Sequence, residues 1–170
     1  MHLLPKLFLR NPALPGTLGQ AGSVMDAIEI RRLGLLDADL VLSVRDGVFD
    51  GPVRPDQVAR KLTAPGQVLV GALAEEGLVG MASGAVVLMP DKAPSFYLDE
   101  IGVHRDWRRR GIGMALGRAV LEEARALGCA GVWLATEADN APARALYARL
   151  GAEAQSGVVV YSWDLGTGAA

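Results

Sequence analysis

A strand that runs into a glycine-led helix constrains this chain more than any other stretch. Residues 96–103 are a predicted strand, and after a short turn Gly111-Ile-Gly113 opens a predicted helix that runs to about Leu127. The first turn of a helix has unpaired N–H groups and a partial positive charge. Because glycines leave the approach to these groups open, the stretch predicts a pyrophosphate site, with Arg108, Arg109 and Arg110 adding positive charge beside it.

Two common phosphate-binding motifs do not account for this stretch. A dinucleotide-binding motif would have a third glycine where this chain has Leu116, and a nucleoside-triphosphate loop would continue with Gly-Lys-Ser/Thr. Glycines that open a helix for packing alone remain an alternative. The arginine run has only Trp107 as an aromatic neighbour and the net charge is −2, so we expect no nucleic-acid partner.

The rest of the chain predicts a mixed order of strands and helices within one unit. Prolines and glycines are frequent before Ser23, so residues 1–25 are a predicted flexible arm, with Met25 as an alternative start, and residues 26–166 a predicted single domain. Hydrophobic periodicity and capping residues, among them Asp37, define the elements. The predicted strands are 28–31, 68–74, 78–88, 96–103, 132–135 and 158–165, and the predicted helices are 37–45, 55–62, 111–127 and 142–150.

Composition narrows the class of protein. With 51% hydrophobic and 21% charged residues the chain is typical of a soluble globular protein, and no stretch reaches the roughly 20 apolar residues of a membrane span. Pro5, Lys6 and Arg10 interrupt the apolar residues near the N-terminus, which disfavours a signal peptide. Cys129 is the one cysteine, so an intramolecular disulfide or a multi-cysteine zinc site is excluded. We expect a cytoplasmic protein without a metal or a membrane partner.

Two halves of the chain together resemble the Gcn5-related N-acetyltransferase (GNAT) superfamily. Arg108-x-x-Gly111-x-Gly113, after a strand ending in Ile101-Gly-Val103, resembles its motif A, and Asn140 with Ala145-Leu-Tyr147 downstream is similar to its motif B. The resemblance covers about residues 28–164. It implies acetyl-CoA as cosubstrate without a metal. The implied fold is a single α/β (α+β) domain, with a mixed, mostly antiparallel sheet that is splayed at the acetyl-CoA site and flanked by helices on both faces.

The resemblance also implies which residues contact acetyl-CoA. Backbone groups of Ile101 to Val103 would pair with pantetheine and polarise the thioester carbonyl. Tyr147 would be the general acid for the leaving thiolate, with a packed aromatic as the alternative. Asn140 would hold the pantetheine or begin a helix. The implied set is Ile101, Gly102, Val103, Arg108, Arg109, Arg110, Gly111, Ile112, Gly113, Met114, Asn140, Ala143 and Tyr147.

The base is less sharply defined by the sequence. Simple alternation groups Tyr97, Asp99, Ile101 and Val103 on one face and Glu100 and Gly102 on the other, but related strands often bulge here. Glu100 best matches the acidic residue that related enzymes place before this site, Asp99 is the second choice, and a structural salt bridge is the alternative for either. His104 is expected in a turn facing solvent, as an auxiliary base.

Residues 35–165 are further similar to aminoglycoside 3-N-acetyltransferases of the GNAT type. The landmarks are Val48-Phe-Asp50, Val87-Leu-Met-Pro90, Leu98 to Val103, Arg109-Arg-Gly-Ile112 and Ala145-Leu-Tyr147, whereas the run after Glu137 and the aromatics near Trp163 depart from that pattern. The likeness implies acetyl transfer to a primary amine of a small cationic substrate, such as the aminoglycoside 3-amino group, by direct attack in a ternary complex, and thus antibiotic resistance. The expected substrate residues are Asp50, Tyr97, Asp99, Glu100, Glu137 and Asp139.

Other acceptors and another class of function stay open. They are a different small amine, an amino acid, a polyamine or a peptide N-terminus, and a non-catalytic acetyl-CoA sensor. The family resemblance also implies a homodimer formed through the last strands and the edge of the sheet, since edge strands invite pairing.

Overall fold

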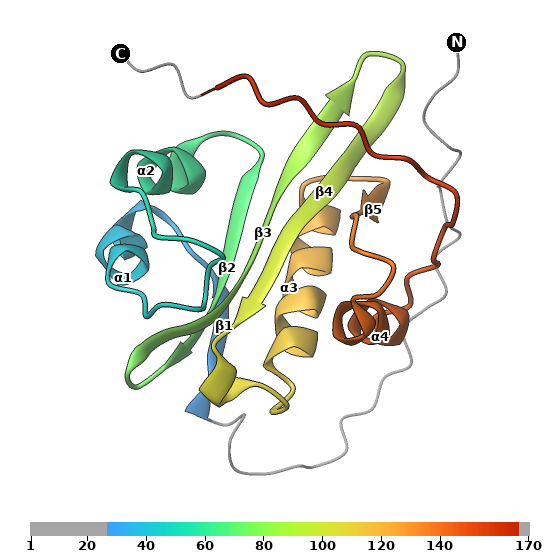
Figure 1. Cartoon of the computed structure of the whole chain (residues 1–170). Coiled ribbons are helices and arrows are strands. Elements are labelled where there is room, and N and C mark those ends of the chain that lie inside the picture. The colour runs from blue at the N-terminus through green and yellow to red at the C-terminus, as the bar shows by residue number, and fades with distance from the viewer. Residues whose placement is uncertain (1–26, 167–170) are drawn as a thin grey trace.

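The computed structural model describes residues 27–166, which form one sheet with helices on both faces (Figure 1). The sheet order is β1-β2-β3-β4-β5; neighbours are antiparallel except β4 and β5, which are parallel. The strands are β1 (Glu29–Arg32), β2 (Gln67–Ala74), β3 (Gly77–Met89), β4 (Lys92–Val103) and β5 (Gly131–Trp133). The helices are α1 (Ala38–Leu42), α2 (Pro55–Thr63), α3 (Ile112–Ala126) and α4 (Ala141–Arg149), with 3-10 turns η2 (Leu35–Asp37) and η3 (Arg105–Trp107).

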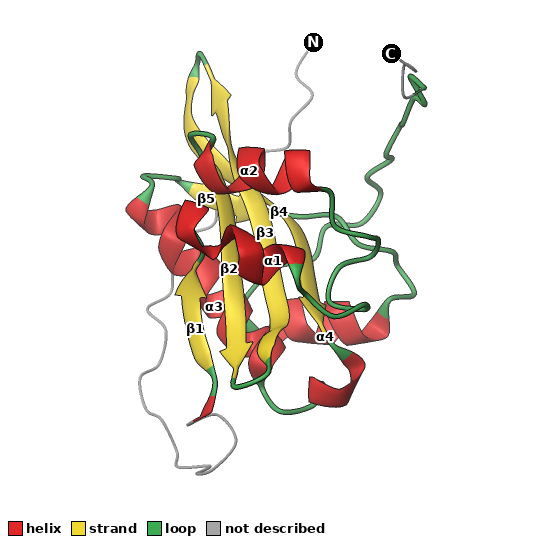
Figure 2. Cartoon of the chain, turned by 90° about the vertical axis from the view of Figure 1, so that its left-hand side faces the viewer, coloured by secondary structure: helices red, strands yellow, loops and turns green. Residues whose placement is uncertain are grey.

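The sheet separates two apolar cores. Alternation along β2 sends Val68 and Val70 toward α3, where they pack with Leu116 and Val120, and sends Leu69 to the opposite face. On that opposite face α1 and α2 cover the sheet, as Figure 2 shows with both helices in front of the strands. The mixed sheet with helices on both faces confirms the predicted fold. None of the helices in residues 27–166 combines the length and the apolar character needed to cross a membrane.

Most predicted elements form within a few residues of their expected bounds, but the last predicted strand does not. Residues 152–166 form no strand or helix, and Val160 and Trp163 are 73% and 79% exposed. The predicted strand at 158–165 is therefore wrong for the single chain, because its apolar side chains find no partner there. The predicted arm at residues 1–25 lies outside the described residues.

Asp37 is the N-cap residue of α1, in agreement with the prediction, but its side chain makes no capping hydrogen bond to that helix. The residue precedes α1, but its carboxylate accepts hydrogen bonds from the Gly34 N–H (2.9 Å) and from two nitrogens of Arg31 (2.6 and 2.9 Å). The Arg31 guanidinium is the main reason that the pKa of Asp37 falls to about 2. The ion pair ties β1 to the turn that begins the α1–α2 layer.

Gly84 permits the closest approach of β3 to β4. A Cβ atom on Gly84 would overlap the ring of Phe96 and the carbonyl oxygen of Tyr97. Phe96 is fully buried, so the ring cannot move aside without disturbing the α3 core.

We expect Gly84→Ala to lower the free energy of unfolding by about 1–3 kcal/mol, the usual cost of overpacking. Gly34→Ala is the matched control, since an added Cβ there meets nothing within 4 Å, and we expect it to change stability by less than about 0.5 kcal/mol. Urea denaturation followed by circular dichroism measures both. Equal stability of the two variants would contradict the close contact.

Candidate active site

The candidate site begins where β4 and β5 separate. The two strands pair only from Ser95 with Gly131 to Tyr97 with Trp133, and then the chain turns away from the sheet. On this side β4 has no strand partner from Leu98 to Val103 within residues 27–166. The splay therefore leaves the outward-facing backbone groups between Ile101 and Val103 without a strand partner, although the Val103 carbonyl accepts a hydrogen bond from Arg108.

Gly111 and Arg109 shape the turn that leads from β4 to α3. Gly111 is the N-cap residue with a φ of 86°, and Arg109 also has a positive φ of 63°. A non-glycine residue in this conformation is uncommon and tends to mark a functional turn. Beyond the cap lie the buried Ile112 and the half-buried Gly113 and Met114, in the turn where helical N–H groups have no helical partner.

The three arginines of the turn have different contacts. Arg108 donates through Nε to the Val103 carbonyl (2.9 Å), so it ties the turn to the end of β4. The Arg110 guanidinium lies 4.6 Å from the ring centroid of Trp107, a cation–π distance. Arg109 is exposed and has no hydrogen bond within the described residues. The turn thus presents positive charge beside the N-terminus of α3.

A β-bulge in β4 changes which side chains share a face. Ser83 pairs with Glu100 and Gly84 with Leu98, so Asp99 is an extra residue. Leu98, Ile101 and Val103 consequently all pack in the α3 core. Asp99 and Glu100 both lie on the opposite face. Simple alternation would have grouped Asp99 with Ile101 and Val103, and the bulge that is common in related strands does occur here.

Glu100 is the most strongly perturbed acid of this site. Burial raises the pKa of its carboxyl to about 7, and the charges of Asp50 and Asp99 add to the shift, while the backbone N–H of Asp50 opposes it. The loop residue Asp50 and the bulge residue Asp99 are both exposed. A carboxyl with a pKa of about 7 exchanges protons readily at neutral pH.

The loop between α1 and α2 is pressed against β4 at Gly102. A Cβ on Gly102 would overlap the carbonyl oxygen of the buried Val48. This contact holds the loop, and with it Asp50, beside the bulge. A glycine at position 102 therefore allows Asp50 to lie close to Asp99 and Glu100.

α4 supplies the other side of the site. Asn140 is its N-cap residue, and its side-chain oxygen accepts a hydrogen bond from the Ala143 N–H (3.2 Å). A Cβ on Gly117 of α3 would overlap Leu150, which indicates how closely α4 packs on α3. Tyr147 is half-buried against the α3 core, and this burial raises the pKa of its phenol.

The remaining residues that the sequence predicted for the site do not lie among the three acids Asp50, Asp99 and Glu100. The Tyr97 and Trp133 rings are in contact in a tilted arrangement, with centroids 4.6 Å apart, at the point where β4 and β5 separate. Glu137 and Asp139 are exposed in the segment between β5 and α4, and neither is among the charges that shift the pKa of Glu100. His104 does not face solvent as predicted. It is buried, and its Nδ1 accepts from the Asp106 N–H (3.3 Å).

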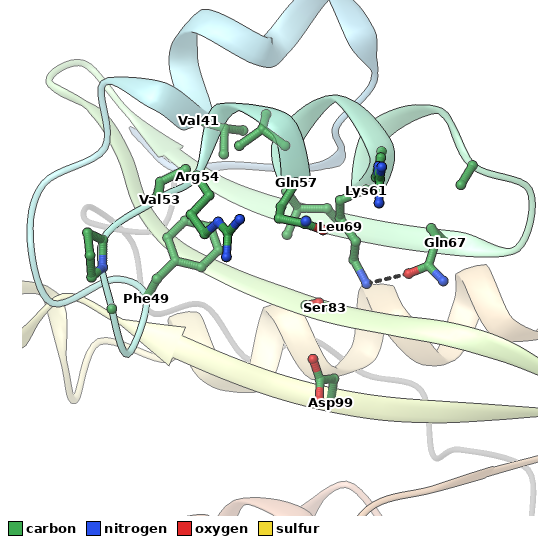
Figure 3. Close-up of a pocket in the computed structure, with 15 residues that line it drawn as sticks. Val41, Phe49, Val53, Arg54, Gln57, Lys61, Gln67, Leu69, Ser83 and Asp99 are labelled. Atoms are coloured by element: carbon green, nitrogen blue, oxygen red, sulfur yellow. Dashed lines mark hydrogen bonds between the residues drawn. The ribbon is translucent and has the colours of Figure 1, made fainter. Parts of the chain in front are cut away.

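A pocket of about 470 Å³ between α2 and the sheet contains residues that the sequence reasoning missed (Figure 3). Arg54, Gln57 and Lys61 line it from α2 and its N-cap, and Ser83 and Asp99 line it from the sheet. The spacing of three and four residues between the α2 side chains was the available signal, since it places them on one helical face. No group of three or more metal-ligating side chains occurs in the described part of the chain.

Comparison with known proteins identifies the family. Residues 42–152 match the acetyltransferase (GNAT) family, whereas no curated protein matches the chain. An aminoglycoside acetyltransferase, meta-AAC0020 from an uncultured soil metagenomic sample, was solved with sisomicin. It has a TM-score of 0.70 at 20% identity, and the match covers 85% of this chain and all (100%) of that one.

Two further solved structures share the fold. The aminoglycoside N-acetyltransferase AAC(6′)-Iy, in complex with CoA, has a TM-score of 0.67 at 22% identity, over 86% of this chain and 99% of that chain. A ribosomal-protein-alanine N-acetyltransferase from Brucella melitensis biovar Abortus 2308 has a TM-score of 0.64 at 23% identity, over 81% and 100%. Because the family match spans well over half of the sequence and the sheet is splayed as expected, the chain belongs to the GNAT family of acetyltransferases.

Proposed function

We propose that this acetyltransferase transfers the acetyl group of acetyl-CoA directly to a primary amine of a small molecule, in one ternary complex. The observation that carries the proposal is Glu100, a carboxyl with a pKa of about 7 beside the unpaired part of β4. The CoA complex of AAC(6′)-Iy supports the choice of cosubstrate.

The site suits acetyl-CoA in two places. Backbone groups between Ile101 and Val103 that bond neither to β3 nor to Arg108 can pair with the pantetheine amides. The open first turn of α3 from Gly111 to Met114 can hold the pyrophosphate. Arg109 and Arg110 supply charge for the phosphates, while Arg108 holds the turn. The N–H of Ala143 already bonds to Asn140, so we assign these two residues to the start of α4 rather than to direct binding.

Glu100 and Tyr147 divide the proton transfers in the proposed mechanism. Acetyl-CoA supplies an activated acetyl group. The ionised Glu100 carboxylate accepts a proton from the ammonium of the acceptor, which leaves a neutral amine that can attack. As the N–C bond forms and the C–S bond breaks, the Tyr147 hydroxyl donates its proton to the departing sulfur, and its raised pKa keeps that proton in place beforehand. The proton that the new amide nitrogen loses then restores the Tyr147 phenol.

The acceptor amine is proposed to lie on the face of the bulge. Asp50 and Asp99 beside Glu100 favour a cationic group there, which supports the 3-amino group of an aminoglycoside as one candidate. The fold is shared with aminoglycoside acetyltransferases, although the name of AAC(6′)-Iy specifies the 6′ position. We further propose the cytoplasm as location, because the half-buried Cys129 is a free thiol.

The last residues support a homodimer. Val158, Val159, Val160, Tyr161, Trp163 and Leu165 are between 62% and 92% exposed. A contiguous apolar stretch of this size is rare on the surface of a monomer, and β5 is a short edge strand with β4 as its one neighbour. We propose that this segment packs against a second copy of the chain.

The rate of acetyl transfer should depend on the ionisation of Glu100. We expect kcat/KM to rise as the pH increases through about 7, because the carboxylate must be deprotonated to act as base. Glu100→Gln should remove this limb and lower the rate by about 10²- to 10⁴-fold. Asp99→Asn should move the limb to lower pH, because a negative charge that raises the pKa of Glu100 is lost. The pH profiles of the unaltered enzyme and of the two variants are measured by the release of free thiol from acetyl-CoA between about pH 5.5 and about pH 9.

Glu76→Gln in the exposed β2–β3 turn is the control, and its pH profile should match that of the unaltered enzyme. An unchanged limb in Glu100→Gln would assign the base to another group.

Tyr147→Phe should lower kcat by about 10²- to 10⁴-fold while the KM for acetyl-CoA changes little, because only the proton donor is removed. Tyr161→Phe, in the exposed C-terminal segment, is the matched control and should leave kcat unchanged. Turnover of Tyr147→Phe within twofold of the unaltered enzyme would rule out the acid role. Binding of acetyl-CoA without thiol release by the unaltered enzyme would favour a sensor.

Deletion of residues 158–170 should convert a dimer into a monomer, because the exposed apolar side chains are removed. Leu36→Ser removes one exposed leucine elsewhere and should leave the dimer intact. Sedimentation velocity at micromolar concentration distinguishes the two forms. A monomeric full chain, or a truncated chain that still dimerises, would contradict the proposal.

A further inference from the structure

The pocket between α2 and the sheet has an apolar wall and a charged face. Phe49, Val58 and Leu69 contribute apolar surface, and the volume of about 470 Å³ is in the range of small-molecule sites. Figure 3 shows Arg54, Gln57 and Lys61 reaching into this space from the helix side, with Asp99 directed toward them from β4. Cationic side chains on the helix side therefore face the Asp99 carboxylate across the pocket.

Lys61 is one of the cationic side chains that line the pocket, and its ammonium is held in place by two hydrogen bonds. Its ammonium donates to the Gln67 side-chain oxygen and to the Gly84 carbonyl, both at 2.9 Å. Both acceptors are neutral, and none of the ion pairs formed within residues 27–166 includes Lys61. Since an ammonium has three N–H donors, one remains for a group inside the pocket.

Arg54 adds a second positive charge at the pocket mouth. Its one carboxylate contact is with Asp56 at 3.4 Å, on the exposed surface, and such a pair contributes little. The Arg54 guanidinium is therefore available for an incoming anion, and its planar donors suit a carboxylate or a phosphate.

Two residues on the sheet side of the pocket are neighbours of the proposed base Glu100, which does not itself line the pocket. Ser83 lines the pocket and pairs across the sheet with Glu100. Asp99 lines the same end and follows directly on β4. The pocket is thus cationic on the α2 side and anionic beside Glu100.

We propose that the acceptor is an amine that also carries an anionic group, a carboxylate or a phosphate, which binds Lys61 and Arg54 while the amine lies beside Glu100. This inference rests on the proposed acetyl transfer, whose acceptor it narrows. A polycation such as an aminoglycoside would instead bring further ammonium groups against Lys61 and Arg54, and like charges at close range are unfavourable.

Matched acceptor pairs test the inference. The pairs are L-histidine with histamine, L-lysine with cadaverine, and phosphoethanolamine with ethanolamine, with gentamicin as the polycation. Thiol release from acetyl-CoA gives kcat and KM for each, and calorimetry in the presence of CoA gives the affinity of each acceptor without any need for turnover. We expect the anionic member of at least one pair to bind about tenfold or more tightly than its partner, and the carboxylate and phosphate arms identify the preferred anion.

The variants Lys61→Met and Arg54→Gln then test whether the anionic group of the acceptor binds these two side chains. We expect each to weaken binding of the anion-bearing acceptor about tenfold or more, with little change for the partner amine that lacks the anion and for acetyl-CoA. Lys92→Met, at the exposed start of β4, is the matched control and should change nothing. Lys61 also donates a hydrogen bond to the Gly84 carbonyl of β3, so Lys61→Met could destabilise the fold. In that case the same comparison is made with Arg54→Gln.

Each alternative result has a distinct meaning. Preference for gentamicin or for the amines without an anion, with normal turnover, would overturn the inference and leave acetyl transfer standing. Equal effects of Lys61→Met on both members of a pair would also overturn it. Failure to bind acetyl-CoA would instead remove the proposed function, and the calorimetric comparison would still decide whether the pocket takes anionic amines.

Discussion

Backbone hydrogen bonding along β4 determines the arrangement of the site. β4 is paired with β3 over most of its length, but its pairing with β5 ends at Tyr97. Backbone groups without partners are costly unless water or a ligand satisfies them, so the free edge from Leu98 to Val103 is a place for a bound molecule. Figure 1 shows α3 and α4 on the same side of the fold as this edge, and the half-buried Tyr147 of α4 packs against the α3 core.

The face opposite α3 has a separate role. The bulge brings two acids to this face of β4, and the contact between Gly102 and Val48 keeps the α1–α2 loop close to them. α2 meanwhile directs cationic side chains toward the pocket that ends at Asp99. The sheet thus separates the candidate coenzyme contacts along its edge from the candidate acceptor contacts on its face.

Local patterns predicted the helices and paired strands well because each is specified by its own periodicity and end signals. Asn140 followed by Pro142, for example, marks the start of α4, and Asn140 does cap that helix. Errors arose where the outcome depends on distant residues. The alternation rule could not reveal the extra residue at Asp99, which follows from pairing with β3, and His104 is buried because the chain folds over it.

The same limit applies to the C-terminal segment and to the acceptor pocket. Residues 158–165 have the apolar content of a strand, but a strand needs a neighbour, and within residues 27–166 this segment pairs with none of the five strands. Lys61 and Arg54 look like ordinary surface cations in the sequence. Their relation to Ser83 and Asp99 arises only when α2 packs on the sheet.

The bulge at Asp99 also makes the site sensitive to the length of the chain. In a regular strand two consecutive side chains point to opposite faces, so adjacent carboxylates on one face require one inserted residue. Loss of a single residue from this stretch would remove the register shift at Asp99, yet it would separate the two acids or drive one of them into the α3 core. At this position a more regular sheet and a working pair of acids are mutually exclusive.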